Sequence, residues 1–392
     1  MDRKVYLDGA SATYINNQVL AEMMPVLTNN YASTSSLHSM GNESKELLEK
    51  ARRRVAKGIH ASSREIYFTS GEDEANTWAI LGLCRANRDK GNHVIVSKIE
   101  KPSILKACKQ LEKEGFKVTY IPVDEFGFIR LSSLMHEIRK DTILVSVGII
   151  NYQVGTIQNL NAIARTVKEK DIIFHCDATY AVGNVSINVK ELNIDAMTIS
   201  SNKIYGPAGV GALYVKENIA IESLIYADED LKEKANIDNL ASIVGFGKAV
   251  ELITQDVTLN AQKLRQIREY LTKQVMEKIE NVTLLGHTHQ RTANIVTLSF
   301  QNIDGEALLS LLDRKGIEVS TLSMNANSNH ETPHVLKAMG VENMLVKSAI
   351  RFSIVKSTTK EDVDYVVENL AKIVKQLREL SPVKMNKQEK ED

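Results

Sequence analysis

The feature that most limits the fold of this chain is an alternation of short apolar runs and amphipathic segments across residues 66–176. The runs are rich in β-branched residues, and the segments between them place apolar residues at helical spacing. Apolar strands separated by helices predict βαβ units, an α/β fold and a mostly parallel sheet that is buried on both faces. We expect strands at 5–7, 66–69, 94–96, 117–122, 143–147 and 172–176, and helices at 43–60, 72–88, 102–114, 131–139 and 160–170.

The C-terminal third has a different pattern. Acidic and lysine-rich sequence at 226–239 interrupts the alternation, and a long amphipathic helix is expected at 258–280. We predict a large domain over 14–257 and a smaller α+β domain formed by 1–13 and 258–382. The polar residues 383–392 are expected to be disordered. Within the smaller domain we expect strands at 295–300, 317–321 and 350–354 and helices at 304–314 and 359–379.

Composition excludes several classes of function. The 392 residues carry 49 basic and 49 acidic side chains, so no net charge draws the chain to nucleic acid or anionic membranes. No apolar run approaches the roughly 20 residues that a membrane span needs. Three widely spaced cysteines (Cys84, Cys108 and Cys176) form neither a disulfide framework nor a metal-ligand pattern. They favour a reducing compartment, and we expect a cytoplasmic protein.

Two residues at predicted strand ends suggest cofactor chemistry. Lys203 follows the strand-like run 198–201 and precedes the chain-breaking Gly206-Pro207. Lysine is the residue that forms a Schiff base with a carbonyl cofactor such as pyridoxal phosphate. Asp177 ends another apolar strand, and pyridoxal enzymes need an acid that keeps the pyridinium nitrogen protonated. Either residue alone is more often an ordinary surface residue at a strand end.

The order of four motifs, 69–71, 177–179, 203–207 and 350–353, resembles that of the cysteine desulfurases, which are pyridoxal-phosphate enzymes of the class V aminotransferase family. The resemblance covers nearly the whole chain. It implies the fold type I architecture: a large domain with a mostly parallel seven-stranded sheet between helices, and a smaller α+β domain. It also implies a homodimer with active sites at the interface. In the family, sulfur from free cysteine passes to partners that build iron–sulfur clusters or thiolated tRNA.

The resemblance assigns roles to five residues. Lys203 matches the Schiff-base lysine, and Asp177 matches the acid that faces the pyridinium nitrogen. Thr179 and Ser200 match residues that contact the cofactor. Arg351 matches the arginine that holds the substrate carboxylate, which suits its planar pair of donors.

One departure from the family affects the reaction itself. The loop after the predicted strand 317–321 carries the nucleophilic cysteine of the family, and Asn325 stands at that position. An amide cannot attack sulfur or store a persulfide. None of the three cysteines is near this loop in sequence. We therefore expect ordinary desulfurase chemistry to be lost.

Further departures fall in the cofactor pocket. Four family residues that the alignment places there are replaced by Lys101, Tyr152, Tyr180 and Asn202. Asp73 replaces a threonine of the phosphate-binding helix start, where a carboxylate would repel a phosphate at a cost of about 1–4 kcal/mol at about 4 Å. Such a carboxylate can cap the helix itself. The segment 234–237 also lacks the family's phosphate-binding threonine.

Three hypotheses follow. The first is a degenerate desulfurase that keeps the fold and a scaffold or partner role in sulfur or iron–sulfur metabolism, while Lys203 pairs with Asp177 or Asp73 in an empty pocket. The second is an active pyridoxal-phosphate lyase or aminotransferase that uses Lys203, Asp177 and Arg351 on an amino acid. The third is a desulfurase whose thiol comes from elsewhere, either from another cysteine of the chain or from a partner, which could be an intact desulfurase.

Overall fold

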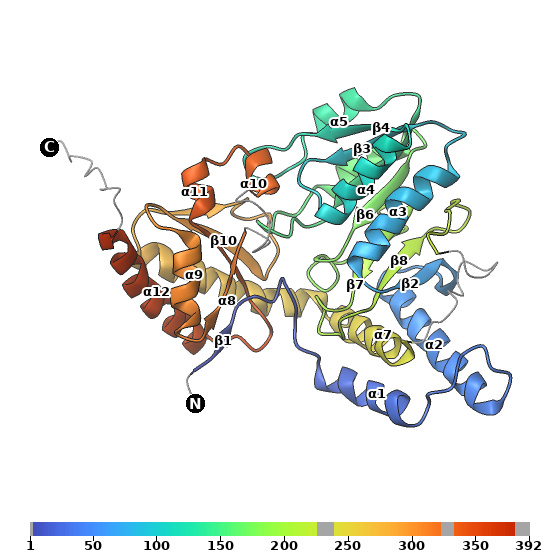
Figure 1. The fold of residues 1–392 in the computed structure, drawn as a ribbon, viewed down its shortest axis with the longest axis horizontal. Helices are drawn as coiled ribbons and strands as arrows, with labels where there is room; N and C mark the ends of the chain where they lie inside the picture. Colours follow the sequence, from blue (N-terminus) through green and yellow to red (C-terminus); the bar gives the residue numbers. More distant parts are fainter. Residues whose placement is uncertain (1–2, 226–238, 323–332, 381–392) are drawn as a thin grey trace.

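A computed structural model describes residues 3–225, 239–322 and 333–380. The chain forms two adjoining units, and each has its own sheet (Figure 1). One unit contains a seven-stranded sheet, and the other is built around a four-stranded sheet. This is the mixed α/β architecture of fold type I, as the sequence predicts.

The larger sheet has the strand order β2-β8-β7-β6-β5-β3-β4. Strand β8 is antiparallel to both of its neighbours, whereas the pairs β7–β6, β6–β5, β5–β3 and β3–β4 are parallel. The central strands are buried along almost their whole length, as their runs of apolar residues predict. The strands are β2 (Ile66–Thr69), β3 (His93–Ser97), β4 (Lys117–Ile121), β5 (Thr142–Gly148), β6 (Ile173–Asp177), β7 (Ala196–Ser200) and β8 (Gly211–Val215).

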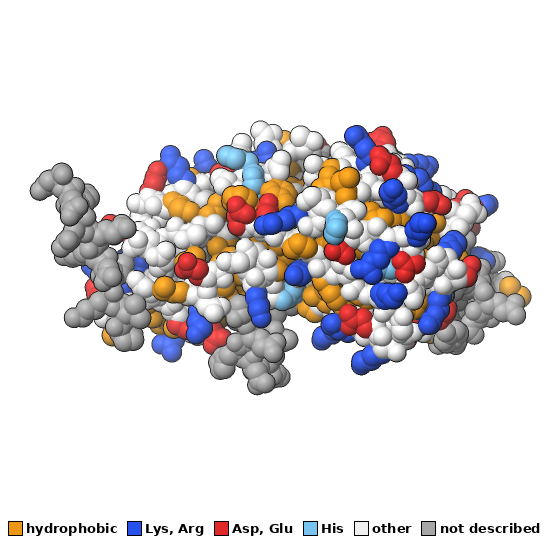
Figure 2. Space-filling model, turned by 90° about the horizontal axis from the view of Figure 1, so that it is seen from above, with side chains coloured by type: hydrophobic (Ala, Val, Ile, Leu, Met, Phe, Trp, Pro, Cys, Tyr) orange, Lys and Arg blue, Asp and Glu red, His pale blue; other side chains and the backbone are white. Residues whose placement is uncertain are grey.

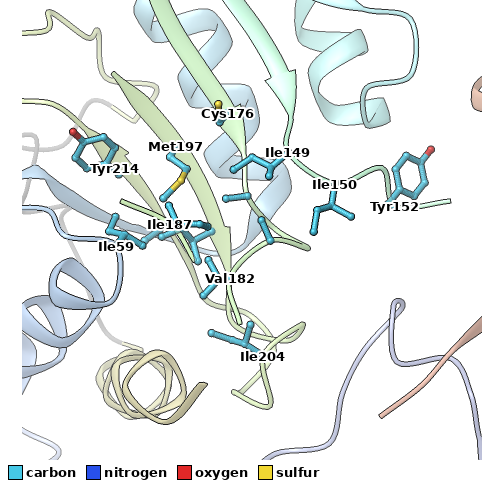
Figure 3. Close-up of a cluster of buried hydrophobic side chains, with 14 of the residues drawn as sticks. Ile59, Ile149, Ile150, Tyr152, Cys176, Val182, Ile187, Met197, Ile204 and Tyr214 are labelled. Atoms are coloured by element: carbon cyan, nitrogen blue, oxygen red, sulfur yellow. The ribbon is translucent and has the colours of Figure 1, made fainter. Parts of the chain in front are cut away.

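Helices cover both faces of this sheet. Helices α3 (Glu72–Ala86) and α4 (Pro102–Lys113) share one apolar cluster, which contains Trp78 and Leu111. A second cluster joins the opposite face to α1 (Asn17–Thr28), α2 (Ser39–Gly58), α5 (Leu131–Glu137), α6 (Leu160–Lys168) and α7 (Leu240–Thr254). Figure 3 shows part of this second cluster, in which Met197 of β7 and Ile59, after α2, lie among other buried side chains.

Gly211 sets a close approach at the carboxyl-end edge of this sheet. It pairs with Thr69 on one side and with Ser200 on the other. A Cβ atom at position 211 would lie 2.7 Å from the carbonyl oxygen of Ile199 and 3.0 Å from the backbone of Gly71. Because position 211 has no side chain, the segment that begins α3 comes close to the end of β7.

The smaller unit contains the antiparallel sheet β12-β13-β10-β9. The N-terminal strand β1 (Val5–Tyr6) pairs with β11 of this unit, which confirms that the start of the chain packs with its C-terminal third. The other elements are α8 (Val257–Lys278), β9 (Val282–Leu285), β10 (Ile295–Phe300), α9 (Gly305–Asp313), β11 (Ile317–Glu318), β12 (Ser320–Thr321), α10 (His334–Ala338), α11 (Asn343–Lys347), β13 (Ala349–Ser353) and α12 (Lys360–Leu380).

The expected elements are present to within a few residues, but six further α-helices and strands among the described residues were not expected from the sequence: α1, α7, α10, α11, β8 and β9. The expected strand 317–321 is divided into β11 and β12, which belong to different sheets. The domain boundaries at 14–257 and 258–382 stay a prediction, and the expected disordered tail lies outside the described residues. Basic and acidic side chains are interspersed on the face seen in Figure 2. No helix among the described residues is both long and apolar enough to cross a membrane.

Candidate active site

The predicted site residues converge at the carboxyl-end edge of the large sheet. Asp177 ends β6 and Ser200 ends β7, so parallel pairing of these strands brings both to the same edge. Lys203 lies in the turn that follows β7, and Lys101 immediately precedes α4. Glu72 is the first residue of α3, after Gly71, whose φ of 152° favours glycine.

Two lysines and two carboxylates form one charged cluster at this edge. Lys101 Nζ lies 3.6 Å from Glu72 Oε1 and 3.6 Å from Asp177 Oδ2. Lys203 Nζ lies 3.5 Å from the same Glu72 oxygen and donates a 2.5 Å hydrogen bond to the backbone oxygen of Ser11. All four side chains are at least four-fifths buried. We call these four residues the charge cluster.

Glu72 is the acidic centre of the charge cluster. Burial by itself would raise the pKa of this carboxyl group, but Lys101, Lys203, a hydrogen bond from the Ser200 hydroxyl and the backbone N–H of Glu72 lower it to about 2. The carboxylate therefore stays ionised well below neutral pH. Helix N-termini favour negative charge, which is consistent with its place at the start of α3.

Lys101 faces both carboxylates without a hydrogen-bond partner among the described residues. Burial would lower its pKa, but the charges of Asp177, Tyr180 and Glu72 raise it overall. The ammonium group also lies 4.9 Å from the centre of the Tyr180 ring, and Lys203 Nζ lies 5.8 Å from it. An ammonium that is buried, charged and free of hydrogen bonds is unusual, and its proton donors point to a site that could hold an additional acceptor.

Asp177 is oriented by polar neighbours. Its Oδ2 accepts a 2.9 Å hydrogen bond from Asn76 Nδ2, and its Oδ1 accepts one of 2.8 Å from the backbone N–H of Thr179. The Thr179 hydroxyl is buried without a partner among the described residues. Behind Asp177, His175 contacts the hydroxyls of Ser146 and Thr198, and burial lowers its pKa to about 4.

Aromatic side chains border the charge cluster. The rings of Tyr152 and Tyr180 stack with their centres 6.4 Å apart. Glu100, next to Lys101, accepts a hydrogen bond from the Ser97 hydroxyl, and burial raises its pKa to about 7. A small cavity of about 10 Å³ lies beside them. It is lined by Ile99, Glu100, Lys101, Gly148, Ile150, Asn151, Tyr152 and Asp177. A cavity of that size holds about one water molecule.

Arg351 of β13 reaches the site from the smaller unit. Its Nη2 donates to Asp8 Oδ1 at 3.0 Å and to Ser11 Oγ at 2.9 Å, while Nη1 donates to the backbone oxygen of Tyr152 at 3.2 Å. The side chain is 4% exposed, and its Nε has no partner among the described residues. The same residue, Ser11, therefore contacts both Arg351 and Lys203.

The structure differs from the expected pairing of Lys203. Asp73 is exposed, and no hydrogen bond to its carboxylate is found among the described residues, so Asp73 does not provide the cap that such a carboxylate could form. Glu72, rather than Asp73 or Asp177, faces Lys203. Three consecutive acidic residues begin α3, and only the direction of the first helical turn decides which of them points inward. Sequence reasoning also missed Asn76 and Glu100.

The predicted residues not yet placed are Asn202, Asn325 and the segment 234–237. Asn202 Oδ1 lies 2.8 Å from the Ser200 hydroxyl, so Asn202 belongs to the site. Asn325 and 234–237 lie outside the described residues.

The three cysteines are unpaired and buried, and burial raises the pKa of Cys108 to about 12 and those of Cys84 and Cys176 as well. No group of side chains in the described ranges has the composition of a metal site.

Comparison with known proteins identifies a class of enzymes to which the chain is similar. The model of the class-V aminotransferases matches residues 5–366. The solved structure of a NifS-like protein superposes with a TM-score of 0.89 at 32% identity, covering 96% of this chain and 100% of that chain. A NifS-like protein of Rickettsia africae gives a TM-score of 0.85 at 28% identity, covering 95% of this chain and 100% of that chain.

The curated relatives narrow the class. Cysteine desulfurase IscS of Clostridium botulinum is 43% identical over 397 residues, which span all of both chains. Cysteine desulfurase IscS of Methanosarcina thermophila is 41% identical and covers 97% of this chain and 95% of its own length. This chain belongs to the cysteine desulfurase family of class-V aminotransferases.

The family is pyridoxal-phosphate dependent, but the residues present here do not fit that cofactor. Its phosphate would meet the ionised Glu72 carboxylate at the start of α3, and two like charges there repel each other. Glu72 already uses the Ser200 hydroxyl and the backbone N–H that a phosphate would need. Lys203 is held by Glu72 and Ser11, so groups of the chain itself occupy the surroundings of its amine.

Proposed function

We propose that this protein is a non-catalytic member of the cysteine desulfurase family, which keeps the fold and serves as a scaffold or partner in sulfur or iron–sulfur metabolism. The observation that carries the proposal is the charge cluster. Its two ammonium groups and two carboxylates balance each other, and it contains Lys203 and Asp177, the two residues that the family resemblance assigns to the cofactor. Asn325 at the position of the nucleophilic cysteine supports the same conclusion, because an amide cannot carry sulfur.

The state of Lys203 is the critical point of the proposal. A lysine that forms a Schiff base must offer a free amine lone pair to the cofactor's carbonyl group. Here the nitrogen donates to the backbone oxygen of Ser11 and lies 3.5 Å from Glu72 Oε1, so groups of its own chain occupy its surroundings. Two contacts of Lys203 therefore oppose its use as a nucleophile: the hydrogen bond to Ser11 and the ion pair with Glu72.

An absorption spectrum tests the proposal directly. The purified protein, after incubation with pyridoxal phosphate and removal of the excess, should have no band at about 390–430 nm, where an internal aldimine absorbs. Lys203→Ala serves as the matched control and should give the same spectrum. A band in the wild type that is absent from the Lys203→Ala variant and disappears on reduction with borohydride would overturn the proposal.

A second candidate function is an active pyridoxal-phosphate lyase or aminotransferase that needs no thiol. It is favoured by the convergence of Lys203, Asp177 and Arg351, since Ser11 contacts Arg351 and Lys203 alike. An amino-acid screen with added pyridoxal phosphate tests it. A product that the wild type forms and the Lys203→Ala variant does not form would establish this function, and a screen without such a product would eliminate it.

A desulfurase with a thiol from elsewhere is the third hypothesis. Within the chain, Cys84, Cys108 and Cys176 are buried and have raised pKa values, so none provides an accessible thiolate. This version of the hypothesis has no support from the geometry. Sulfide released from free cysteine by the wild type, and lost after Cys→Ser substitution at any of these positions, would restore it. A thiol from a partner chain would instead require that partner in the assay.

We infer that the protein forms a homodimer in the cytoplasm, as the family resemblance implies. Helix α1 supports the dimer, because Leu20, Met24 and Leu27 are more than two-fifths exposed and recur at helical spacing on one face. The three unpaired cysteines suit a reducing compartment. A sulfur acceptor or an iron–sulfur scaffold protein is the expected further partner; nucleic acid and membranes are not.

A further inference from the structure

Glu72 has the surroundings of a bound anion. Its carboxylate accepts hydrogen bonds from the Ser200 hydroxyl and from its own backbone N–H at the start of α3, and it faces the ammonium groups of Lys101 and Lys203. A helix N-terminus, a hydroxyl and cationic side chains are the donors with which proteins hold phosphate and similar oxyanions. The carboxylate thus satisfies an oxyanion site from within the chain.

The start of a helix would not by itself indicate such a site, but Lys101 is a separate observation. Its side chain comes from the loop before α4, is about nine-tenths buried, and has no hydrogen-bond partner among the described residues. The ammonium lies 3.6 Å from Glu72 Oε1, beyond ordinary hydrogen-bond length. Lys101 therefore has unused donors directed at the position that the Glu72 carboxylate occupies. A larger anion with more oxygen atoms could use them.

We propose that Glu72 is a tethered anion that closes a latent oxyanion site, formed by the first turn of α3, Ser200, Lys101 and Lys203, and that without its carboxylate the site binds inorganic phosphate. This inference rests on the proposed function, because it explains how a family member came to lack a place for the cofactor's phosphate. The Glu72 carboxylate closes the site, because it contacts Lys101 and Lys203. The Asp73 side chain is exposed and does not close it.

A tethered anion competes with any free anion for the same donors. Glu72 cannot diffuse away, so its effective concentration at the site exceeds that of millimolar phosphate in solution. Its substitution removes both this competition and the like-charge repulsion against phosphate. We therefore expect the affinity for phosphate to increase about tenfold or more when the carboxylate is removed.

The test is a phosphate titration of the full-length protein at constant ionic strength, without pyridoxal phosphate, followed by calorimetry and by the thermal unfolding midpoint. Glu72→Ala should bind phosphate about tenfold tighter than the wild type or better, and its midpoint should rise with phosphate concentration. Asp73→Ala is the matched control, because it removes the neighbouring exposed carboxylate and the same net charge. It should change the affinity by less than about twofold.

A second pair of variants tests the named donors and guards against misfolding. Glu72→Gln keeps the side-chain volume while losing the charge, so it too should bind phosphate more tightly than the wild type. The double variant Glu72→Ala/Ser200→Ala should lose at least about half of the gain, since one hydroxyl donor is gone. If folded Glu72→Ala and Glu72→Gln bind phosphate no more tightly than the wild type, or if Asp73→Ala gains as much as they do, the inference is wrong.

This experiment separates the inference from the proposed function. A pyridoxal-phosphate band in the wild type would overturn the proposed function, whatever the phosphate titration gives. Unchanged phosphate affinity in the Glu72 variants would overturn the inference on the oxyanion site, even if the wild type remains colourless with the cofactor.

Discussion

Glu72 Oε1 lies 3.5 Å from Lys203 Nζ, so the lysine to which the sequence resemblance assigns the Schiff base faces a carboxylate of its own chain. The same oxygen lies 3.6 Å from Lys101 Nζ. One acidic side chain therefore holds two cations. The fourth member of the charge cluster, Asp177, pairs with Lys101 alone among the cations of the described residues.

The contribution of Glu72 to stability should depend on pH. Its pKa of about 2 is below the ordinary 4.5, so its ionised form stabilises the fold fully above pH 4.5 and progressively less as the pH falls toward 2. Glu72→Gln should lower the free energy of unfolding by about 1–3 kcal/mol at neutral pH, and by much less near pH 3. Urea unfolding of both proteins at the two pH values measures this. A deficit that does not depend on pH would contradict the prediction.

Glu100 should have the opposite effect on the pH dependence of stability. Burial raises its pKa from 4.5 to about 7, so the folded state keeps a proton that the unfolded state loses. This residue should therefore reduce stability as the pH rises from 4.5 to 7, with a constant penalty above that range. Glu100→Gln should be up to about 3 kcal/mol more stable than the wild type at pH 8, and should match it more closely near pH 5. Denaturant midpoints at these pH values check the sign.

The cysteines should be unreactive in the folded protein. All three are buried, and burial raises their pKa values, so little thiolate is available at neutral pH. We expect a thiol reagent such as Ellman's reagent to label none of them in native buffer and all three in urea. Rapid labelling of one thiol in the native protein would reopen the hypothesis of an in-chain sulfur carrier.

The exposed face of α1 should be needed for dimer formation. Replacing Leu20, Met24 and Leu27 by glutamate places charges on a stripe that is apolar and exposed in the single chain. We expect the triple variant to elute as a monomer when light scattering follows size-exclusion chromatography. Met135 on α5 is 61% exposed, and Met135→Glu is the control that should leave the dimer intact. A monomeric wild type, or a triple variant that stays dimeric, would refute this interface.

The large sheet was predictable because its buried strands consist of short apolar runs at regular intervals, as in 143–147. Helix α7 was missed for a related reason. Its buried residues lie on most of its circumference, from Leu240 to Ile253, and two glycines interrupt it, so it shows no amphipathic period. The strand β9 is only partly buried along most of its length, which weakens its apolar signal.

The candidate site was predictable only as a set of residues. The pattern of strands indicated that Asp177 and Lys203 lie near one another, because parallel strands end at the same edge of a sheet. The family resemblance added Ser200 and Arg351 to that site. The pairing among them depends on side-chain direction, which a sequence pattern does not give. Glu72 and Asp73 are neighbours in the chain, yet one is largely buried between two lysines and the other is exposed.

Because Gly211 has no side chain, the start of α3 can lie close to the end of β7. A methyl group there would meet the Ile199 carbonyl at 2.7 Å and the Gly71 backbone at 3.0 Å, and would force α3 away from β7. That displacement would move Glu72, the first residue of α3, away from Ser200 at the end of β7, whose hydroxyl donates to the Glu72 carboxylate. A substitution at Gly211 would therefore disturb the contacts of the charge cluster without removing any of its charged groups.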